Sequence, residues 1–238
     1  MSDYFIFGDI DTRNYNGIYV YFDNVDSTPT RVGDFVEVPG RNGAMFLDGG
    51  RYEDVTQTYD IIALTIDAGR NLINALASKV GHFRLQDSFN PTEYYSAVFT
   101  SEVDPNVTMQ RDKISFKVSF TRKPQRFLTS GSTVISVTDG STITNPTLFD
   151  ARPRIQLTGA GTLTIEGTRI TSTAPSGTTV YIDCDTMEIY RYNGSTLTNG
   201  SSLISFSTVD FPVLEPGASS IEISGVTDVK ITPRWWKI

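Results

Sequence analysis

The sequence predicts a mainly β protein of two domains, with a single α-helix in the first domain. Short runs rich in Val, Ile, Thr, Tyr and Phe are separated by Gly, Pro, Asn, Asp and Ser about every eight to twelve residues, a spacing typical of many antiparallel strands. The chain has 238 residues, which is enough to bury the cores of two β domains of ordinary size.

The first domain is predicted to span residues 1–128, and its clearest strand runs from Lys113 to Arg122. Apolar residues take every second position of this strand: Ile114, Phe116, Val118 and Phe120. Because side chains alternate between the two faces of a strand, we expect one face to pack and the other to meet solvent or a partner.

A single helix is predicted over about residues 68–80, with Asp67 as its N-cap and Gly81 just past its end. Apolar residues recur along it at helical spacing: Leu72, Ile73, Leu76, Ala77 and Val80. This stripe is expected to cover one side of a sheet.

Two turns are predicted ahead of the helix. Asp48-Gly49-Gly50 is typical of a hairpin turn, between strand segments 44–47 and 51–55. The short loop 39–43 has turn residues at both ends, Pro-Gly and Asn-Gly, and so determines where Arg41 points.

The chain changes in composition after Leu128. Residues 129–145 contain no basic residue and are rich in Ser, Thr and Gly, so we predict a linker there and a second domain over residues 146–238. The predicted strands of this domain are short: Arg154–Leu157, Thr162–Glu166, Thr179–Cys184, Met187–Tyr190, Ser202–Phe206, Ser220–Ser224 and Val229–Thr232. Their spacing is typical of a two-sheet β-sandwich.

Charge and composition argue against several classes of function. The formal net charge is -7, and nucleic-acid binding depends largely on Lys and Arg displacing counterions, so sequence-specific DNA or RNA binding is not expected. One cysteine, Cys184, and one histidine, His82, leave no intrachain disulfide and too few ligands for a zinc site. We predict no catalytic, cofactor-binding or metal-binding residues.

The N-terminal residues lack the basic region and the cleavage site of a signal peptide. No apolar run approaches the roughly 20 residues that cross a bilayer. We therefore expect synthesis in the cytoplasm and no membrane insertion.

Enzyme hypotheses depend on few residues. A Ser/His/Asp hydrolase would need His82, but no Gly-x-Ser-x-Gly elbow accompanies it, and a histidine at a helix end is typical of contact with the last carbonyls. Paired carboxylates for glycoside hydrolysis stay an open alternative among the 27 acidic residues. Asp183 and Asp185 flank Cys184, where a strand-end turn is favoured over a calcium site.

A basic cluster surrounds the strand that ends the first domain: Arg111, Lys113, Lys117, Arg122, Lys123 and Arg126. It has three interpretations. A nucleic-acid patch would need aromatic residues on the same face, and these lie on the opposite face. A protein contact could meet acidic residues of an identical subunit, with Asp3, Asp9 and Asp11 as candidates. A solvated edge protected by lysines needs no partner.

Several phrases spread over nearly the whole chain occur together: Val38–Gly43, Gly50–Val55, Phe120–Phe127, Thr144–Thr147, Arg152–Pro153, Tyr181–Glu188, Phe211–Gly217 and Pro233–Trp236. In this order they resemble the distal tail protein (Dit) family of siphophages that infect Gram-positive bacteria. The resemblance implies a structural, non-enzymatic protein of the virion, at the tail tip. It also implies an N-terminal domain that forms a homo-hexameric ring, and a C-terminal galectin-like or carbohydrate-module-like β-sandwich outside that ring.

The same resemblance implies a set of partners. The ring would join the tail tube protein and the tape-measure protein above to baseplate, tail-associated and receptor-binding proteins below. The candidate subunit or partner contacts are Arg41, Asn42, Lys113, Lys117, Arg122, Lys123 and Arg126.

The alternative is a carbohydrate-binding module that contacts saccharides of the host cell wall. Its candidate glycan contacts are Tyr190, Tyr192 and Trp236. Trp235 and Trp236 are adjacent, so in a last strand their rings would lie on opposite faces. We expect one ring to pack and the other to be available to a ligand. A wall hydrolase is the third hypothesis.

Overall fold

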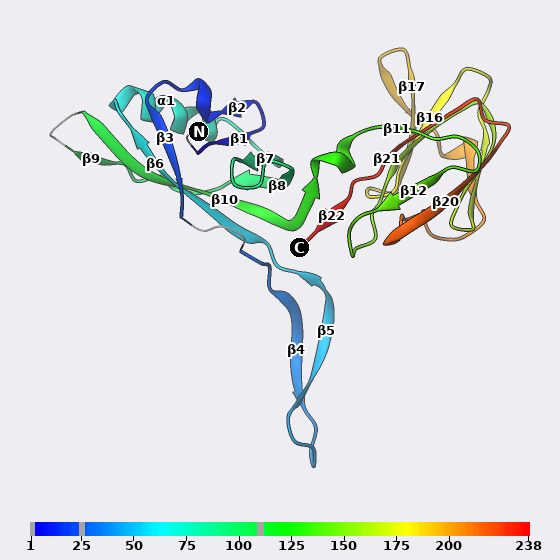
Figure 1. Ribbon diagram of the computed structural model, residues 1–238, viewed down its shortest axis with the longest axis horizontal. Coiled ribbons are helices and arrows are strands. Elements are labelled where there is room, and N and C mark those ends of the chain that lie inside the picture. Colours follow the sequence, from blue (N-terminus) through cyan, green and yellow to red (C-terminus); the bar gives the residue numbers. More distant parts are fainter. Residues whose placement is uncertain (1–2, 24–26, 109–111) are drawn as a thin grey trace. The chain divides into compact units, whose positions relative to one another are not determined.

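The structure is a computed structural model that describes residues 3–23, 27–108 and 112–238 (Figure 1). The chain folds into two compact units, Met1–Arg126 with Ile238 (unit 1) and Phe127–Lys237 (unit 2). Both units are built mainly of β-strands, and the described residues contain one α-helix, as predicted.

Unit 1 is built on one large antiparallel sheet with the strand order β2-β1-β7-β8-β10-β6-β3. Its strands are β1 Phe5–Phe7, β2 Ile10–Asp11, β3 Ile18–Phe22, β6 Val55–Ala63, β7 Phe83–Asp87, β8 Glu93–Phe99 and β10 Lys113–Leu128. The short strand β9 (Asn106–Thr108) pairs with the start of β10, and a 3-10 turn, η1 (Thr12–Asn14), follows β2.

Strand β10 confirms the predicted alternation and supplies much of the unit 1 core. Its inward side chains are at most 5 % exposed: Ile114, Phe116, Val118 and Phe120. It pairs with β6 over nine positions, from Ile114 opposite Ala63 to Arg122 opposite Val55. The strand continues past Arg122 and through Pro124 to Leu128, further than the sequence pattern indicates.

The helix α1 spans Ile66–Ala77, two residues earlier than predicted at its start and three earlier at its end. Its N-cap is Thr65, whose Oγ1 accepts a hydrogen bond from the Ala68 N–H at 3.2 Å, so Asp67 lies in the first turn instead. Val80 lies beyond the helix and is 90 % exposed, and it therefore has no part in the packed stripe.

Gly69 lets the helix lie close to the sheet. A Cβ added at this position would be 2.4 Å from Cδ1 of Ile114 and 3.2 Å from Cβ of Ala63. The buried leucines of the helix, Leu72 and Leu76, then reach the core over β6 and β10.

Strands β4 (Arg31–Glu37) and β5 (Ala44–Tyr52) form a separate two-stranded sheet, the β4–β5 hairpin. The predicted turn at Asp48-Gly49-Gly50 is wrong, because these residues lie inside β5, where Asp48 pairs with Gly33. The chain turns instead in the loop 39–43, where turn chemistry was also predicted: Gly40 and Gly43 both have φ +81°.

Unit 2 is a two-sheet sandwich, as predicted. One sheet has the order β11-β21-β13-β16-β17-β18 and the other β12-β20-β14-β15-β19. The strands are β11 Ile135–Ser136, β12 Thr142–Asn145, β13 Arg154–Thr158, β14 Ala160–Ile165, β15 Thr168–Thr173, β16 Thr179–Asp183, β17 Glu188–Asn193, β18 Thr196–Asn199, β19 Ile204–Phe206, β20 Gly217–Ser224 and β21 Asp228–Thr232. Buried residues of both sheets, such as Leu157 and Ile231 from one and Leu163 and Ile221 from the other, share one core.

The segment 129–145 is not a linker, contrary to its composition. It contains a 3-10 turn, η2 (Thr129–Ser132), and strands β11 and β12, which pair with β21 and β20. Val137 and Ile143 are buried in the unit 2 core. These isolated apolar residues, in a segment of Ser, Thr and Gly, are too few to show a strand pattern in the sequence, and the pairing partners lie far away along the chain.

Two further short elements complete unit 2. The 3-10 turn η3 (Ser201–Leu203) joins β18 to β19, and the last strand is β22 (Trp236–Lys237). The Leu128 N–H donates a hydrogen bond to the Trp235 carbonyl at 2.9 Å.

The packing of α1 predicts that Leu72→Ala destabilises unit 1. Leu72 is fully buried, so the substitution removes apolar contacts, leaves a cavity and lowers the free energy of unfolding by about 2–5 kcal/mol. Hydrogen exchange of the α1 and β10 peptides in increasing urea measures it. Both tryptophans lie in unit 2, so their fluorescence reports unit 2 separately. Asn71→Ala, on the exposed side of the helix, is the control, and an equal loss in both variants would contradict the packing account.

Candidate functional site

The β4–β5 hairpin carries the first predicted contact residues. Arg41 and Asn42 are exposed at its tip, in the loop that joins β4 to β5. The Arg41 N–H donates a hydrogen bond to the Val38 carbonyl at 3.1 Å, which closes the turn. The loop therefore holds these two side chains at the end of a two-stranded ribbon, where they are open to a partner.

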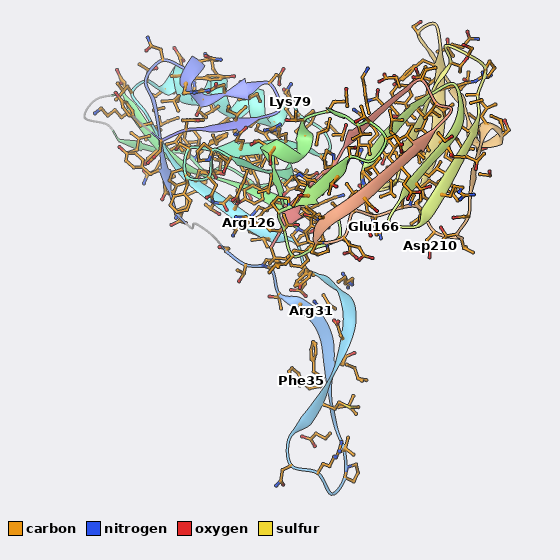
Figure 2. The ribbon with its side chains drawn as sticks, turned by 45° about the vertical axis from the view of Figure 1, so that its right-hand side comes forward. Arg31, Phe35, Lys79, Arg126, Glu166 and Asp210 are labelled. Carbon is orange, nitrogen blue, oxygen red and sulfur yellow. The ribbon has the colours of Figure 1, made fainter. Side chains whose placement is uncertain are left out.

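The two faces of the hairpin are both apolar and exposed. On one face Phe35 lies opposite Phe46, with ring centroids 5.1 Å apart, and Phe35 is 74 % exposed. Figure 2 shows the Phe35 side chain standing off the ribbon. On the other face Val36 lies opposite Met45, and Leu47 follows at 49 % exposure. These contact residues were not predicted from the sequence. The available signal was the presence of five apolar residues in two neighbouring strand segments.

An ion pair on one face holds the base of the hairpin. Arg31 donates its Nε–H to Asp48 Oδ1 at 2.8 Å, contacts Oδ2 with Nη2, and donates from Nη1 to the Tyr52 hydroxyl at 2.8 Å. These hydrogen bonds raise the pKa of Arg31, and together with the Gly50 N–H they lower the pKa of Asp48. The strands are therefore cross-linked by charge at the end away from the tip.

The exposed part of the predicted basic cluster is smaller than the sequence indicates. Lys117 is ion-paired with Asp23 at 2.9 Å and with Asp60 at 3.5 Å, and the hydrogen bond to Asp23 raises its pKa. It lines a groove of about 670 Å³ on the outward face of β3, β6 and β10. Lys123 is exposed and Lys113 is half-buried, while Arg111 lies outside the described residues.

Arg122 and Arg126 are buried, so they do not belong to an exposed basic patch. Arg122 is 0 % and Arg126 is 6 % exposed. Arg122 follows Phe120 on the inward side of β10, donates from Nη2 to the Ser27 carbonyl at 2.6 Å, and stacks its guanidinium 4.3 Å from the Tyr95 ring. Burial lowers its pKa. A prediction from charge alone places both arginines at the surface. They are buried instead, because the alternation of inward and outward side chains along β10 continues beyond Phe120.

Of the three acidic counterparts expected for the cluster, Asp9 and Asp11 form ion pairs within unit 1, and Asp3 accepts a hydrogen bond from the Ser88 hydroxyl at 3.3 Å. Asp9 is ion-paired with Lys79 at 2.5 Å, and Asp11 with Arg13 at 2.6 Å. Each pair lowers the pKa of its carboxyl through the side-chain hydrogen bond.

Unit 2 gathers three tyrosines on the outward face of its six-stranded sheet. Tyr181 on β16 lies opposite Tyr190 on β17, with ring centroids 5.3 Å apart and planes 3° from parallel. Tyr192 is 51 % exposed, and its ring stands edge-on to both. Burial raises the pKa of Tyr190. The structure thus brings the predicted Tyr190 and Tyr192 together and adds Tyr181, which sequence reasoning missed because finding it requires the β16–β17 register.

Trp236 is engaged within unit 2 instead. Its indole stacks on Phe149 at 4.4 Å between ring centroids, and its Nε1–H donates to the Asp150 carbonyl at 2.9 Å. Trp235 is 4 % exposed and belongs to the core, as expected for one of the two indoles. Trp236 is not the freely available indole that was expected, because Phe149 and Asp150 hold it.

Asp183 ends β16 and organises the turn that follows. It accepts hydrogen bonds from Arg234 at both oxygens, each at 2.6 Å, and from the Asp185 and Thr186 N–H groups at 3.1 and 3.3 Å. Burial alone would raise the pKa of Asp183, but the hydrogen bonds and the charge of Arg234 outweigh it and lower the pKa. The carboxylate therefore holds both the turn and Arg234, as expected for a residue of a strand-end turn.

Over residues 3–23, 27–108 and 112–238, no group of three or more His, Cys, Asp or Glu side chains is placed to hold a metal ion. No helix in the same ranges is long and apolar enough to span a membrane.

The chain as a whole is similar to solved phage structures. It superposes on the SPP1 Dit (gp 19.1) protein, described as a paradigm of the hub adsorption apparatus in phages that infect Gram-positive bacteria, with a TM-score of 0.71 over 100 % of both chains at 9 % identity. The chain has the Dit fold. It is also similar to a chain of the phage P2 baseplate in its activated conformation with Ca, with a TM-score of 0.57 over 97 % of both chains at 10 % identity, and to the form with Sr at 0.55 and 11 %.

No family model and no curated protein matches the sequence. The sequence identity to these structures is only 9–11 %. The similarity therefore lies in the fold and not in the identity of the side chains. It covers both units in their order along the chain, in agreement with the fold that the sequence resemblance implies.

The Asp183–Arg234 pair predicts a pH-dependent stability of unit 2. A carboxylate with a lowered folded pKa stabilises the fold above its ordinary pKa of 3.8, and this contribution is lost as the pH falls through the lowered value. Asp183→Asn is expected to cost about 1–3 kcal/mol at neutral pH and less near pH 2, measured by urea unfolding with tryptophan fluorescence. Asp185→Asn, whose side chain is exposed, is the control. A cost that does not change with pH would contradict the ion-pair account.

Proposed function

We propose that this chain is a structural, non-enzymatic protein of a phage tail, and that it acts as a hub at the distal end of the tail tube. The observation that carries the proposal is the likeness of both units, in order and over the whole chain, to the SPP1 Dit protein. The likeness to a chain of the phage P2 baseplate supports the same location in the virion. The protein would be made in the host cytoplasm and then assembled into the tail.

The β4–β5 hairpin supports assembly into a homo-hexameric ring. A two-stranded hairpin is marginally stable alone, and this one exposes apolar side chains on both faces, so it gains stability when another subunit covers it. A contact between two different surfaces of identical subunits closes into a ring when the rotation allows, and every subunit is then satisfied. Unit 1 would form the ring and unit 2 would lie at its periphery.

The hub would hold different partners at its two ends. The tail tube protein and the tape-measure protein would bind above, and baseplate, tail-associated and receptor-binding proteins below. Arg41 and Asn42 at the hairpin tip, with Lys113, Lys117 and Lys123 on the outward face of β10, are the proposed subunit or partner contacts. Arg122 and Arg126 do not belong to this set, because they are buried.

The ring's channel would have to let DNA pass. A chain with a net charge of -7 suits such a channel, since like charge discourages phosphates from binding to its wall. A channel lining with net positive charge in the assembled ring would contradict this part of the proposal.

The assembly proposal predicts that Phe35→Asp with Phe46→Asp abolishes the hexamer. Two carboxylates placed in a buried apolar contact would each carry a large desolvation cost. Native mass spectrometry and negative-stain microscopy are expected to show hexameric rings for the wild type and monomers for the variant. Leu148→Asp, which changes an exposed apolar residue of unit 2, is the control and keeps the ring. Rings formed by the double variant would refute the role of the hairpin.

The non-enzymatic part of the proposal has its own test. Zymography on host cell walls is expected to show no lytic band with purified protein. A clear band that survives purification of a ring-forming sample would overturn the assignment as a purely structural protein.

A further inference from the structure

The outward face of the six-stranded sheet of unit 2 carries a straight row of five side chains, one from each of five neighbouring strands. The strand register places them directly opposite one another in the order Lys230, Gln156, Tyr181, Tyr190 and Asn199. We call this set the cross-strand row. It runs from β21 through β13, β16 and β17 to the edge strand β18.

The row is turned away from the core by the alternation within each strand. Val229 and Ile231 flank Lys230 and are buried, as are the residues on either side of Gln156 and of Tyr181. Tyr192 lies two residues beyond Tyr190 on the same face and is 51 % exposed. The row and Tyr192 therefore form one solvent-facing surface.

Pairing within the sheet accounts for only part of this surface. Cross-strand aromatic pairs stabilise a sheet, and this is a sufficient reason for the stacking of Tyr181 on Tyr190. It does not require a third, half-exposed tyrosine standing edge-on to the pair, nor polar amides on both sides of the pair.

Several hydrogen-bonding groups of the surface are left for a ligand. In the part of the chain that the structure describes, the Gln156 amide and the Tyr181 and Tyr192 hydroxyls make no hydrogen bond. Asn199 uses its Oδ1 to accept from the Ser201 N–H and hydroxyl, both at 2.7 Å, which orients its amide group. Neutral polar groups thus lie on both sides of the aromatic rings along one line.

The surface has little net charge. Lys230 is paired with Asp228 at 2.9 Å, and Asp183 with Arg234 at 2.6 Å. Arg154 and Glu188, which lie opposite Asp183 on the same face, add one charge of each sign, and Arg154 lies against the Tyr190 hydroxyl. A polyanion such as a nucleic acid needs a row of unpaired cations, which is not what this surface offers. Aromatic rings with neutral polar groups fit a ligand that has many hydroxyls and apolar C–H faces.

The dimensions fit a chain and not a single sugar. Four steps between neighbouring strands, at about 4.8 Å each, carry the row about 19 Å across the sheet. At its Tyr190–Asn199 end it reaches a pocket of about 820 Å³. Met187, Leu197 and Phe211 line this pocket together with polar residues that include Glu188 and Ser201, so it supplies a concave site of mixed character where the flat row ends.

We propose that the cross-strand row binds a linear, uncharged oligosaccharide of several sugar units, with one end of the chain in the pocket beside Asn199. The tyrosines contact the apolar faces of the sugars, and Gln156 and Asn199 bind their hydroxyls. Trp236 is no part of this site, because its indole is held by Phe149 and Asp150. The inference concerns unit 2 alone and does not depend on the ring formed by unit 1.

The experiment screens the full chain on an array of neutral and acidic glycans, followed by calorimetry with each linear oligosaccharide that binds. The wild type is expected to bind at least one neutral linear oligosaccharide. Tyr181→Ala with Tyr190→Ala is expected to weaken that binding by about tenfold or more. Gln156→Ala and Tyr192→Ala, which leave the stacked pair of Tyr181 and Tyr190 in place, are expected to weaken it several-fold without disturbing the fold, which tryptophan fluorescence checks.

Two matched controls are expected to leave binding unchanged. Tyr19→Ala with Tyr21→Ala removes an exposed pair of tyrosines from β3 of unit 1, and Trp236→Phe keeps the stack on Phe149. The proposal is overturned if the wild type binds no neutral oligosaccharide, if it prefers acidic glycans or DNA, or if only Trp236→Phe reduces binding. Because ring formation is measured separately through the hairpin, failure here leaves the assembly proposal standing.

Discussion

The strict alternation of side chains along each β-strand is the constraint on which both units depend. In unit 1 it places the apolar side chains from Ile114 to Phe120 of β10 in the core. Lys117 lies on the opposite face of the same strand. In unit 2 it buries the residues on either side of Tyr181 and turns Tyr181 outward. Since one face of every core sheet must supply a core, only the outward faces and the segments outside these sheets remain to meet partners.

In the β4–β5 hairpin this division is absent. Phe35 and Phe46 make one face apolar, Val36 and Met45 the other, and all four side chains are exposed. Within the hairpin, the two strands are held together by the cross-strand pairs and by the contacts of Arg31. A segment with this composition needs cover from outside its own chain, which is why it supports assembly more strongly than any charged group does.

Charged residues illustrate how position in a strand outweighs residue type. Arg122 and Lys123 are neighbours in the sequence, yet Arg122 is fully buried against Tyr95 and Lys123 is exposed. Asp183 is likewise held at the end of β16, where Arg234 lowers its pKa against the effect of burial. Both buried charges hold backbone segments in place, so their chemistry serves the fold, while the outward rows are free to serve recognition.

The sequence by itself determined the elements whose pattern is local. The alternation of β10, the apolar stripe at Leu72 and Leu76, and the loop 39–43 could all be predicted because neighbours along the chain carry the signal. Only the tertiary structure decided that residues 129–145 join the unit 2 sheets, that Asp48 lies within a strand, and that Tyr181 meets Tyr190 in a row across five strands. These depend on which strand pairs with which and in what register, and that choice is made by burial of the whole core, which no local pattern contains.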